Sequence, residues 1–226
     1  MKLQYLGDSK DSFKWDYHDY LMSELNYPLL NIVLMMTPND KSNDGKTEPE
    51  EFPARKSVLR FCRDLKSSPD IERLKDLPKS TGASYQVMLH KNSFHFTNSN
   101  RTDYFSGFNS GYPQIVFLDP DNGFEPEKSC KDKHISYTDV SNILAQLTNN
   151  SIVTVFQHFR RVPFQEDFAR IRKRLKTGYS TAIHWNSLMF IIISTSKLSI
   201  KRVIAANQKY KEGRPVKIIT GEFGIR

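Results

Sequence analysis

Long apolar segments are absent from this sequence. Its longest apolar runs, Ile32–Met36 and Leu188–Ile193, have the length of a β-strand, whereas a transmembrane helix needs about 20 apolar residues. The first residues, MKLQYLGDSKDSF, contain no apolar stretch long enough for a signal peptide. We therefore expect a cytoplasmic protein that has no membrane partner.

Cysteine is scarce, and the common catalytic signatures are missing. The two cysteines, Cys62 and Cys130, are too isolated to form a zinc site or a disulfide framework. The sequence contains no G-x-G-x-x-G turn, P-loop, G-x-S-x-G elbow or H-E-x-x-H helix. These absences exclude Gly-rich nucleotide cradles and the usual hydrolase and zinc-protease signatures in their standard form.

Charge is distributed unevenly along the 226 residues, whose net charge is +8. Residues 151–226 carry 15 Lys and Arg against 4 Asp and Glu, a balance of +11, whereas residues 1–150 have a balance of −3. A basic half beside an acidic half favours a polyanionic partner such as nucleic acid. The alternative is a basic surface that is simply solvated.

The order of the predicted elements indicates an α/β fold. Helical periodicity predicts helices at 8–25, 54–66, 69–77, 137–147, 164–176 and 197–211. Apolar or alternating runs predict strands at 30–37, 114–118, 151–156, 179–185, 188–194 and 216–220. Residues 84–97 suggest a hairpin or a strand with an edge partner, 98–113 a loop, and 38–53 a candidate mobile loop. We expect a single domain over residues 1–226, with a Rossmann-like, mostly parallel sheet, helices on both faces and an antiparallel edge hairpin.

The segment DPDNG directly follows the predicted strand at 114–118. Ligands of open α/β sheets bind outside the carboxyl ends of the strands, where this segment places Asp119. Asp121 could share a hard metal ion with Asp119, and Asn122 could hold a base edge or an amide. The same residues also suit an ordinary turn, which is the alternative interpretation.

The helix at 8–25 carries a second group of polar residues. Asp11, Lys14 and His18 share one face, opposite an aromatic stripe. A carboxylate, an amine and an imidazole on one face could bind a metal, position a phosphate or move a proton. Gly7 and Asp8 at the start of the helix resemble a ligand-binding loop. The alternative is a capped amphipathic helix with ordinary charge pairs.

A third group begins with His158, just after the strand at 151–156. His158 could act as a base, as a ligand or as a buried hydrogen-bonding group. A basic patch follows it, and we expect this patch to contact phosphates of nucleic acid. The patch consists of Arg160, Arg161, Arg170, Arg172, Lys173, Arg174 and Lys176.

The predicted order over residues 114–194 is strand, DPxx, helix, strand, helix and hairpin. This order resembles the second half of class I S-adenosylmethionine-dependent methyltransferases. The nearest likeness is to the large-subunit ribosomal RNA adenine-N6 methyltransferase family, which also opens with a Gly-Asn…Asp…Lys helix ahead of its first strand. Gly7, Asp8, Asp11 and Lys14 occupy similar places here.

The resemblance implies S-adenosylmethionine as cofactor and Asp119 as the residue that orients the amine of the substrate. Asp121 and Asn122 stand where the family has its second proline and its aromatic residue. The residues that the resemblance assigns to the cofactor are Gly7, Asp8, Asp11, Thr37 and Asn39.

Three hypotheses follow. The leading one is a nucleic-acid-modifying enzyme of methyltransferase-like fold with Asp119, Asp121, Asn122, Lys14 and His158 at its site. The second is a metal-dependent nuclease or phosphohydrolase, in which aspartates of the same segments hold Mg²⁺ or Mn²⁺ and Lys14 neutralises the transition state. The third is a non-catalytic module of degenerate methyltransferase fold that binds nucleic acid or a protein through its basic half.

Overall fold

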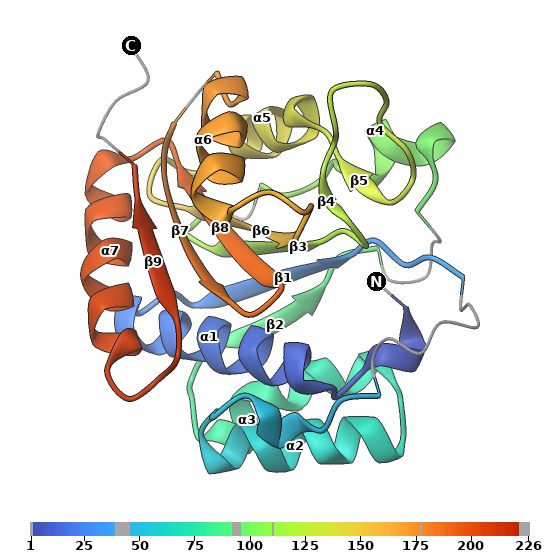
Figure 1. Cartoon of the computed structure of the whole chain (residues 1–226), viewed down its shortest axis with the longest axis vertical. Coiled ribbons are helices and arrows are strands. Elements are labelled where there is room, and N and C mark those ends of the chain that lie inside the picture. Colours follow the sequence, from blue (N-terminus) through green and yellow to red (C-terminus); the bar gives the residue numbers. More distant parts are fainter. Residues whose placement is uncertain (1, 39–45, 92–95, 110, 177, 222–226) are drawn as a thin grey trace.

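A central β-sheet organises the structure, a computed structural model that describes residues 2–38, 46–91, 96–109, 111–176 and 178–221. Within these residues the strand order is β2-β1-β3-β6-β8-β7-β9 (Figure 1). β2, β1, β3 and β6 are parallel, whereas β8 is antiparallel to its neighbours β6 and β7. The strands are β1 Leu29–Leu34, β2 Gln86–Leu89, β3 Ile115–Asp119, β6 Ile152–His158, β7 Tyr179–Trp185, β8 Leu188–Ser194 and β9 Lys217–Thr220. The predicted Rossmann-like, mostly parallel α/β sheet is confirmed.

The predicted hairpin forms from β7 and β8, and β9 adds a further antiparallel strand outside it. β8 reads LMFIIIS and is buried along its whole length. Such an apolar run suits a strand that is covered on both faces of the sheet. β8 lies inside the sheet, between β6 and β7. β9, with both of its end residues exposed, forms the edge.

Helices cover both faces of the sheet. The helices are α1 Ser9–Leu25, α2 Lys56–Ser67, α3 Leu77–Thr81, α4 Arg101–Tyr104, α5 Tyr137–Gln146, α6 Phe164–Arg174 and α7 Lys197–Lys211. α1 and α7 share one apolar core with the sheet, α5 and α6 share the other, and α2 and α3 pack against α1 (Figure 1). Among the described residues, no helix is both long enough and apolar enough to cross a membrane.

The first helix is buried on its polar face as well as on its aromatic face. Phe13 packs 5.0 Å from Phe190 of β8, measured between ring centroids. His18, on the other face, is fully buried, and its Nε2 lies 2.7 Å from Oγ1 of Thr154 on β6. Burial lowers the pKa of His18 to about 3, so the ring is neutral. His18 therefore belongs to the core and does not line the pocket that Asp11 and Lys14 line, so the alternative of a solvated amphipathic helix does not hold at His18.

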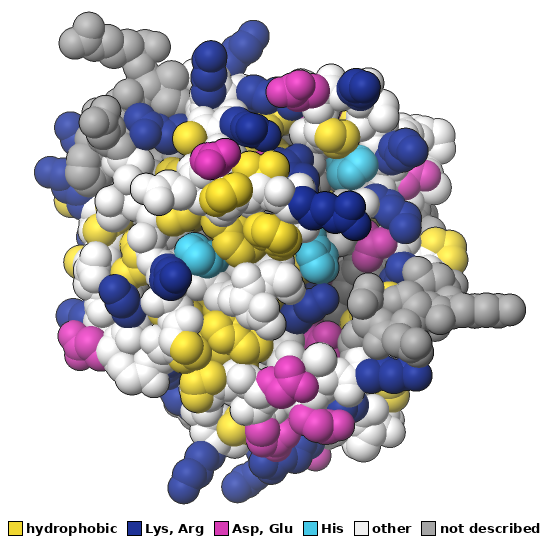
Figure 2. Space-filling view, viewed as in Figure 1, with side chains coloured by type: hydrophobic (Ala, Val, Ile, Leu, Met, Phe, Trp, Pro, Cys, Tyr) yellow, Lys and Arg dark blue, Asp and Glu magenta, His cyan; other side chains and the backbone are white. Residues whose placement is uncertain are grey.

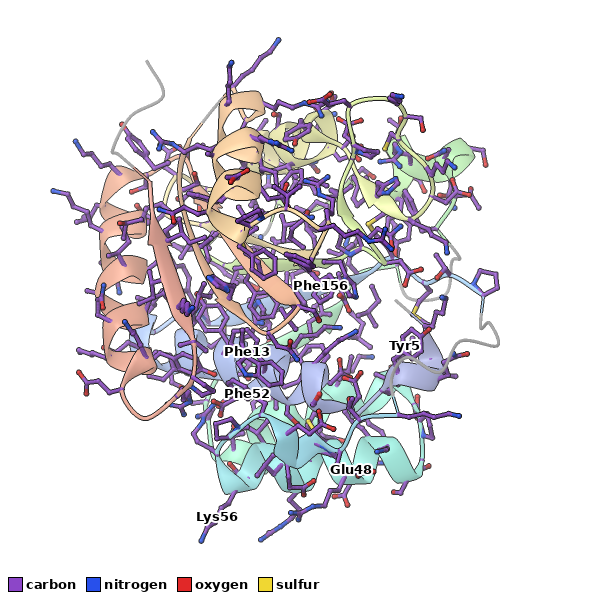
Figure 3. All side chains as sticks on the ribbon, in the orientation of Figure 1. Tyr5, Phe13, Glu48, Phe52, Lys56 and Phe156 are labelled. Carbon is purple, nitrogen blue, oxygen red and sulfur yellow. The ribbon has the colours of Figure 1, made fainter. Side chains whose placement is uncertain are left out.

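Part of the segment predicted to be a mobile loop is packed. Residues 39–45 lie outside the described residues, but a 3-10 turn, η2, follows at Pro49–Glu51. The ring of Phe52 is fully buried 4.7 Å from that of Phe13 (Figure 3). The Thr47 hydroxyl accepts a hydrogen bond from the backbone N–H of Ser9. Residues 46–53 thus cover the start of α1.

Two predictions between residues 69 and 113 need correction, and a third is only partly covered by the described residues. The segment 69–77 is mainly a 3-10 helix, η3 Ile71–Asp76, because Pro78 has no N–H to continue an α-helix through this point. In the segment 84–97 the predicted strand forms as β2, which pairs in parallel with β1, whereas its expected partner run falls largely on residues 92–95, outside the described residues. The predicted loop at 98–113 contains η4 Asn98–Asn100 and α4, because Thr97 and Asn100 form a capping box.

Candidate functional site

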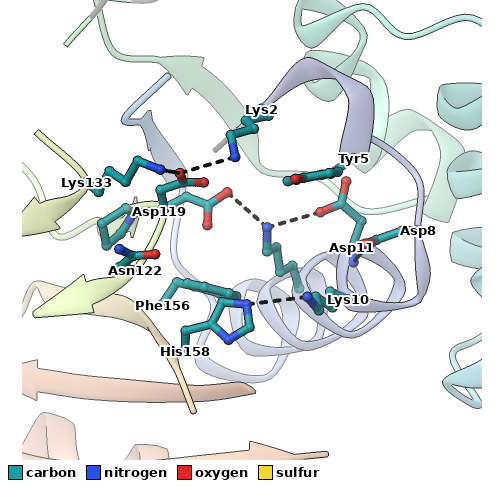
Figure 4. A pocket seen from close by; sticks show the side chains of 13 residues that line it. Lys2, Tyr5, Asp8, Lys10, Asp11, Asp119, Asn122, Lys133, Phe156 and His158 are labelled. Atoms are coloured by element: carbon teal, nitrogen blue, oxygen red, sulfur yellow. Dashed lines mark hydrogen bonds and ion pairs between the residues drawn. The ribbon is translucent and has the colours of Figure 1, made fainter. Parts of the chain in front are cut away.

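A pocket of about 260 Å³ lies at the carboxyl ends of β3 and β6, beside the first turn of α1 (Figure 4). Parallel neighbouring strands end at the same edge of a sheet, which is why residues far apart in the sequence meet here. The pocket is lined by Lys2, Tyr5, Asp8, Lys10, Asp11, Lys14, Asp119, Pro120, Asp121, Asn122, Lys133, Phe156 and His158.

The start of α1 is fixed by a glycine and two carboxylates. Gly7 has φ +79°, and a Cβ there would overlap the backbone carbonyl of Cys62. The Asp8 carboxylate caps the helix by accepting a hydrogen bond of 2.8 Å from the backbone N–H of Asp11. The Asp11 carboxylate in turn accepts a hydrogen bond of 2.9 Å from the N–H of Gly7. This turn therefore directs both carboxylates toward the pocket.

Lys14 joins this turn to the tip of β3. Its Nζ lies 3.0 Å from Oδ2 of Asp119 and 3.2 Å from Oδ1 of Asp11 (Figure 4). All three side chains are more than nine-tenths buried. Nζ also lies 4.8 Å from the ring centroid of Phe156. Removing charges from water is costly, so their mutual pairing is what makes this burial possible.

The pKa shifts in this cluster follow from burial and from the neighbouring charges. Burial, and then the charge of Asp11, raise the pKa of Asp8 to about 6. Burial likewise raises the pKa of Asp11. For Lys14, burial would lower the pKa, but the charges of Asp119, Asp11 and Asp8 outweigh it and raise the pKa above its ordinary value. With all groups ionised the cluster has more negative than positive charge, which favours a cationic group in a ligand.

Amines surround Asp121 at the other side of the pocket. Its Oδ2 accepts a hydrogen bond of 3.2 Å from the Thr37 hydroxyl and lies 3.8 Å from Nζ of Lys2 and 3.7 Å from Nζ of Lys133. Burial would raise the pKa of Asp121, but nearby positive charges, including those of Lys2 and Lys133, lower it overall. Asp121 is therefore ionised at neutral pH and holds the two lysines beside the pocket.

The side chain of Gln157, on β6, supports the backbone of the DPDNG segment. Gly123 has φ +94°, and a Cβ there would overlap the side chain of Gln157. Oε1 of Gln157, which is fully buried, accepts a hydrogen bond of 2.8 Å from the N–H of Phe124. The N–H of Asn122 donates to the carbonyl of Lys133 at 3.0 Å, beside the short strands β4 Gly123–Phe124 and β5 His134–Ile135. The backbone of this segment is thus held on two sides.

The basic patch lies on and before α6, and its first member, Arg160, follows the pocket-lining His158 by two residues. Lys and Arg side chains gather over the upper half of the face in Figure 2, where α5, α6 and the β4–β5 segment lie. Arg160 pairs with the buried Asp167 at 2.7 Å, and Arg174 lies 4.2 Å from the ring centroid of Tyr137. Arg172 is partly buried. The exposed members are Arg161, Arg170, Lys173, Arg174 and Lys176.

The predicted catalytic residues Asp119, Asp121, Asn122, Lys14 and His158 all line one pocket. Of the residues assigned to the cofactor, Asp8 and Asp11 line the pocket. Gly7 and Thr37 each donate a hydrogen bond to a lining carboxylate, Gly7 to that of Asp11 and Thr37 to that of Asp121. Asn39 lies outside the described residues.

Several lining residues were missed by the sequence reasoning. Lys2 and Lys133 come from segments with no apolar periodicity, and the alternating run that contains Phe156 predicts only a strand. Lys10, whose Nζ lies 3.4 Å from Nε2 of His158, precedes Asp11 in the predicted site helix. Its place between Gly7 and Lys14 is the one signal in the sequence that could have identified it.

The arrangement constrains metal chemistry. The Lys14 amine lies between Asp11 and Asp119, where a cation shared by these carboxylates would have to bind. Across the described ranges, no group of three or more His, Cys, Asp or Glu side chains is arranged to hold a metal ion.

The sequence matches no protein-family model, and no curated protein is significantly similar to it.

Proposed function

We propose that this protein is a nucleic-acid-modifying enzyme of methyltransferase-like fold that acts at the pocket around Asp119. The observation that carries the proposal is the ion pair of 3.0 Å between Lys14 and Asp119 at the tip of β3. It fixes the orientation of a carboxylate that lines a pocket at the carboxyl edge of the sheet, where ligands of this fold class bind. A cytoplasmic location is part of the same proposal.

The residues present fit S-adenosylmethionine by their charge. This cofactor has a carboxylate, which suits the amines of Lys2 and Lys10, and cationic ammonium and sulfonium groups, which suit Asp8 and Asp11. Tyr5 and Phe156 offer aromatic surface. When bound, the cofactor supplies an electrophilic methyl group. The pocket volume of about 260 Å³ is just below the ~300–1,000 Å³ of typical ligand sites, so the bound cofactor would extend beyond the pocket.

The chain's own residues would bind and orient the substrate. The Asp119 carboxylate, held through Oδ2 by Lys14, would accept a hydrogen bond from an amino group of the target base. Asn122, which is exposed beside it, would contact a second polar edge of that base. The exposed cations of the basic patch would hold phosphates, which position a nucleic acid without reading its sequence.

One observation favours a second candidate, a non-catalytic binding module of the same fold. Asp119 and Asp11 are already paired with Lys14, so neither carboxylate needs a ligand to offset its burial. The same pairing disfavours the metal-dependent nuclease or phosphohydrolase. Such an enzyme would hold Mg²⁺ or Mn²⁺ between these carboxylates, and Lys14 would first have to leave.

A thermal-shift titration separates the three. A ligand at 100 times its dissociation constant adds about 2.7 kcal/mol, which raises the melting temperature of a chain of this size by roughly 5–10 °C. We expect this shift with S-adenosylmethionine and S-adenosylhomocysteine. A shift with Mg²⁺ or Mn²⁺ alone would instead support the metal-dependent enzyme, and no shift with any of the four would support the binding module.

A further inference from the structure

An aromatic residue is exposed at the carboxyl end of β6, next in sequence to a residue that lines the pocket. Phe159 directly follows His158, which lines the pocket, and the residue is 46% exposed. Phe159 itself does not line the pocket. The other large hydrophobic residues exposed among the described ones are Met88, Tyr112 and Leu198, and none of these is next in sequence to a residue that lines it. Phe159 thus presents apolar surface to solvent at the carboxyl end of β6, next to the proposed site.

This ring is held in place by its surroundings. The backbone N–H of Phe159 donates a hydrogen bond of 2.8 Å to the carbonyl of Ser187, in the turn between β7 and β8. Its ring contacts that of Phe164 edge to face, with centroids 5.5 Å apart and planes at 74°. Phe164 packs in turn 4.8 Å from the ring of His184. Because backbone and neighbours position it, the ring would lose little conformational freedom when a flat ligand stacks on it.

Positive charge continues from Phe159 along α6. Arg160, the next residue, lines a second pocket of about 280 Å³ together with Arg170, Arg174 and Tyr137, and three carboxylates, those of Glu125, Glu127 and Asp167, line it too. Arg174 packs over the Tyr137 ring, and Arg160 is fixed by its ion pair with Asp167. Cations that follow one another beside an aromatic ring match a chain of phosphates with flat bases attached to it.

We infer that Phe159 stacks on a base of single-stranded nucleic acid whose phosphates lie along the cations of α6. This inference rests on the proposed function and names the form of its substrate. In a duplex the face of each base is already covered by its neighbours, whereas in a single strand the face is open to an aromatic side chain. One base on Phe159 would leave a neighbouring base close to the pocket that contains Asp119.

The test measures binding of a fluorescein-labelled single strand of about 16 nucleotides. We expect Phe159→Ala to bind it about 5- to 150-fold more weakly than the wild type, and Phe159→Trp to keep the affinity, because either aromatic ring can stack. Leu198→Ala, which truncates a hydrophobic residue of α7 that is 66% exposed and does not line the pocket, is the matched control and should bind normally. Tryptophan fluorescence of Phe159→Trp should change on binding by more than that of the wild type.

Equal binding by Phe159→Ala and wild type would overturn the inference, as would a wild type that binds duplex as tightly as single strand or binds neither. A methyl-transfer assay separates this inference from the function on which it rests. Phe159-dependent binding without methyl transfer would contradict the proposed function alone. Methyl transfer that does not depend on Phe159 would contradict the stacking alone.

Discussion

Nζ of Lys14 lies 3.0 Å from Oδ2 of Asp119, and this ion pair joins the first helix to the tip of β3 across 105 residues of sequence. The second contact of Lys14, with Asp11, ties the same amine to the first turn of α1. One side chain therefore holds together the two segments that supply most of the carboxylates of the pocket.

Replacing Lys14 should be costly for stability. Lys14→Met keeps the length of the side chain but leaves Asp11 and Asp119 buried without their cation. Removing one partner of a buried pair costs about 3–5 kcal/mol. We expect a loss of this size in urea unfolding at pH 7. Lys10→Met, at a less buried amine of the same helix, is the control and should change the stability by less than about 1 kcal/mol. Equal stabilities of the two variants would contradict the role given to Lys14.

Asp8→Asn should stabilise the protein in a pH-dependent way. The pKa of Asp8 is raised from 3.8 to about 6 in the folded chain, so between these values the unfolded chain releases a proton that the folded chain keeps. Stability of the wild type therefore falls as pH rises through this window, and the full penalty is present above pH 6. Asn caps a helix as well as Asp does, so the variant keeps the cap and loses the penalty.

We accordingly expect Asp8→Asn to be more stable than the wild type by up to about 3 kcal/mol at pH 7.5 and equally stable at pH 3.5. Urea unfolding of both proteins at the two pH values measures the difference. Asp8→Ala, which removes the cap as well as the charge, should be less stable than Asp8→Asn by about 1 kcal/mol at both. A stability difference between Asp8→Asn and wild type that is independent of pH would refute the interpretation.

Gly123→Ala should disturb the DPDNG segment. The φ of +94° disfavours any residue with a Cβ, and the added atom would overlap Gln157. Backbone strain of this kind costs about 1–3 kcal/mol, and the overlap adds to it. We expect a lower melting temperature and weaker ligand binding in the pocket. Gly213→Ala is the matched control, because Gly213 also has positive φ, +76°, but a Cβ there meets nothing within 4 Å. Gly213→Ala should lose stability only through strain and should leave ligand binding unchanged.

The regular elements of the second half could be predicted closely from the sequence. β7, β8 and α7 have the predicted bounds, because the apolar runs are long and the turn between the strands is short. The prediction was wrong where short-range hydrogen bonding decides the structure. Asp70 caps the 3-10 helix that follows it, by accepting a hydrogen bond from the N–H of Glu72, and Pro78 then prevents an α-helix from continuing through this point.

The candidate site was predictable in part because its residues follow strand ends. Asp119 and His158 could be placed at one edge from the strand pattern alone, and Lys14 from its helix. Lys2 and Lys133 could not, since a lysine in an irregular segment looks like any solvated charge. His18 shares a helical face with Asp11 and Lys14, but its depth under β6 depends on tertiary packing, which the spacing does not reveal.

Transfer of a labelled methyl group from S-adenosylmethionine to single-stranded RNA and DNA tests the central claim most directly. The matched variant is Asp119→Asn, which keeps the shape of the side chain but removes the charge that pairs with Lys14. We predict that the wild type labels nucleic acid and that Asp119→Asn does so about 100-fold more slowly or worse. No labelling by the wild type, or equal rates for the two proteins, would contradict the assignment of this pocket as a methyl-transfer site.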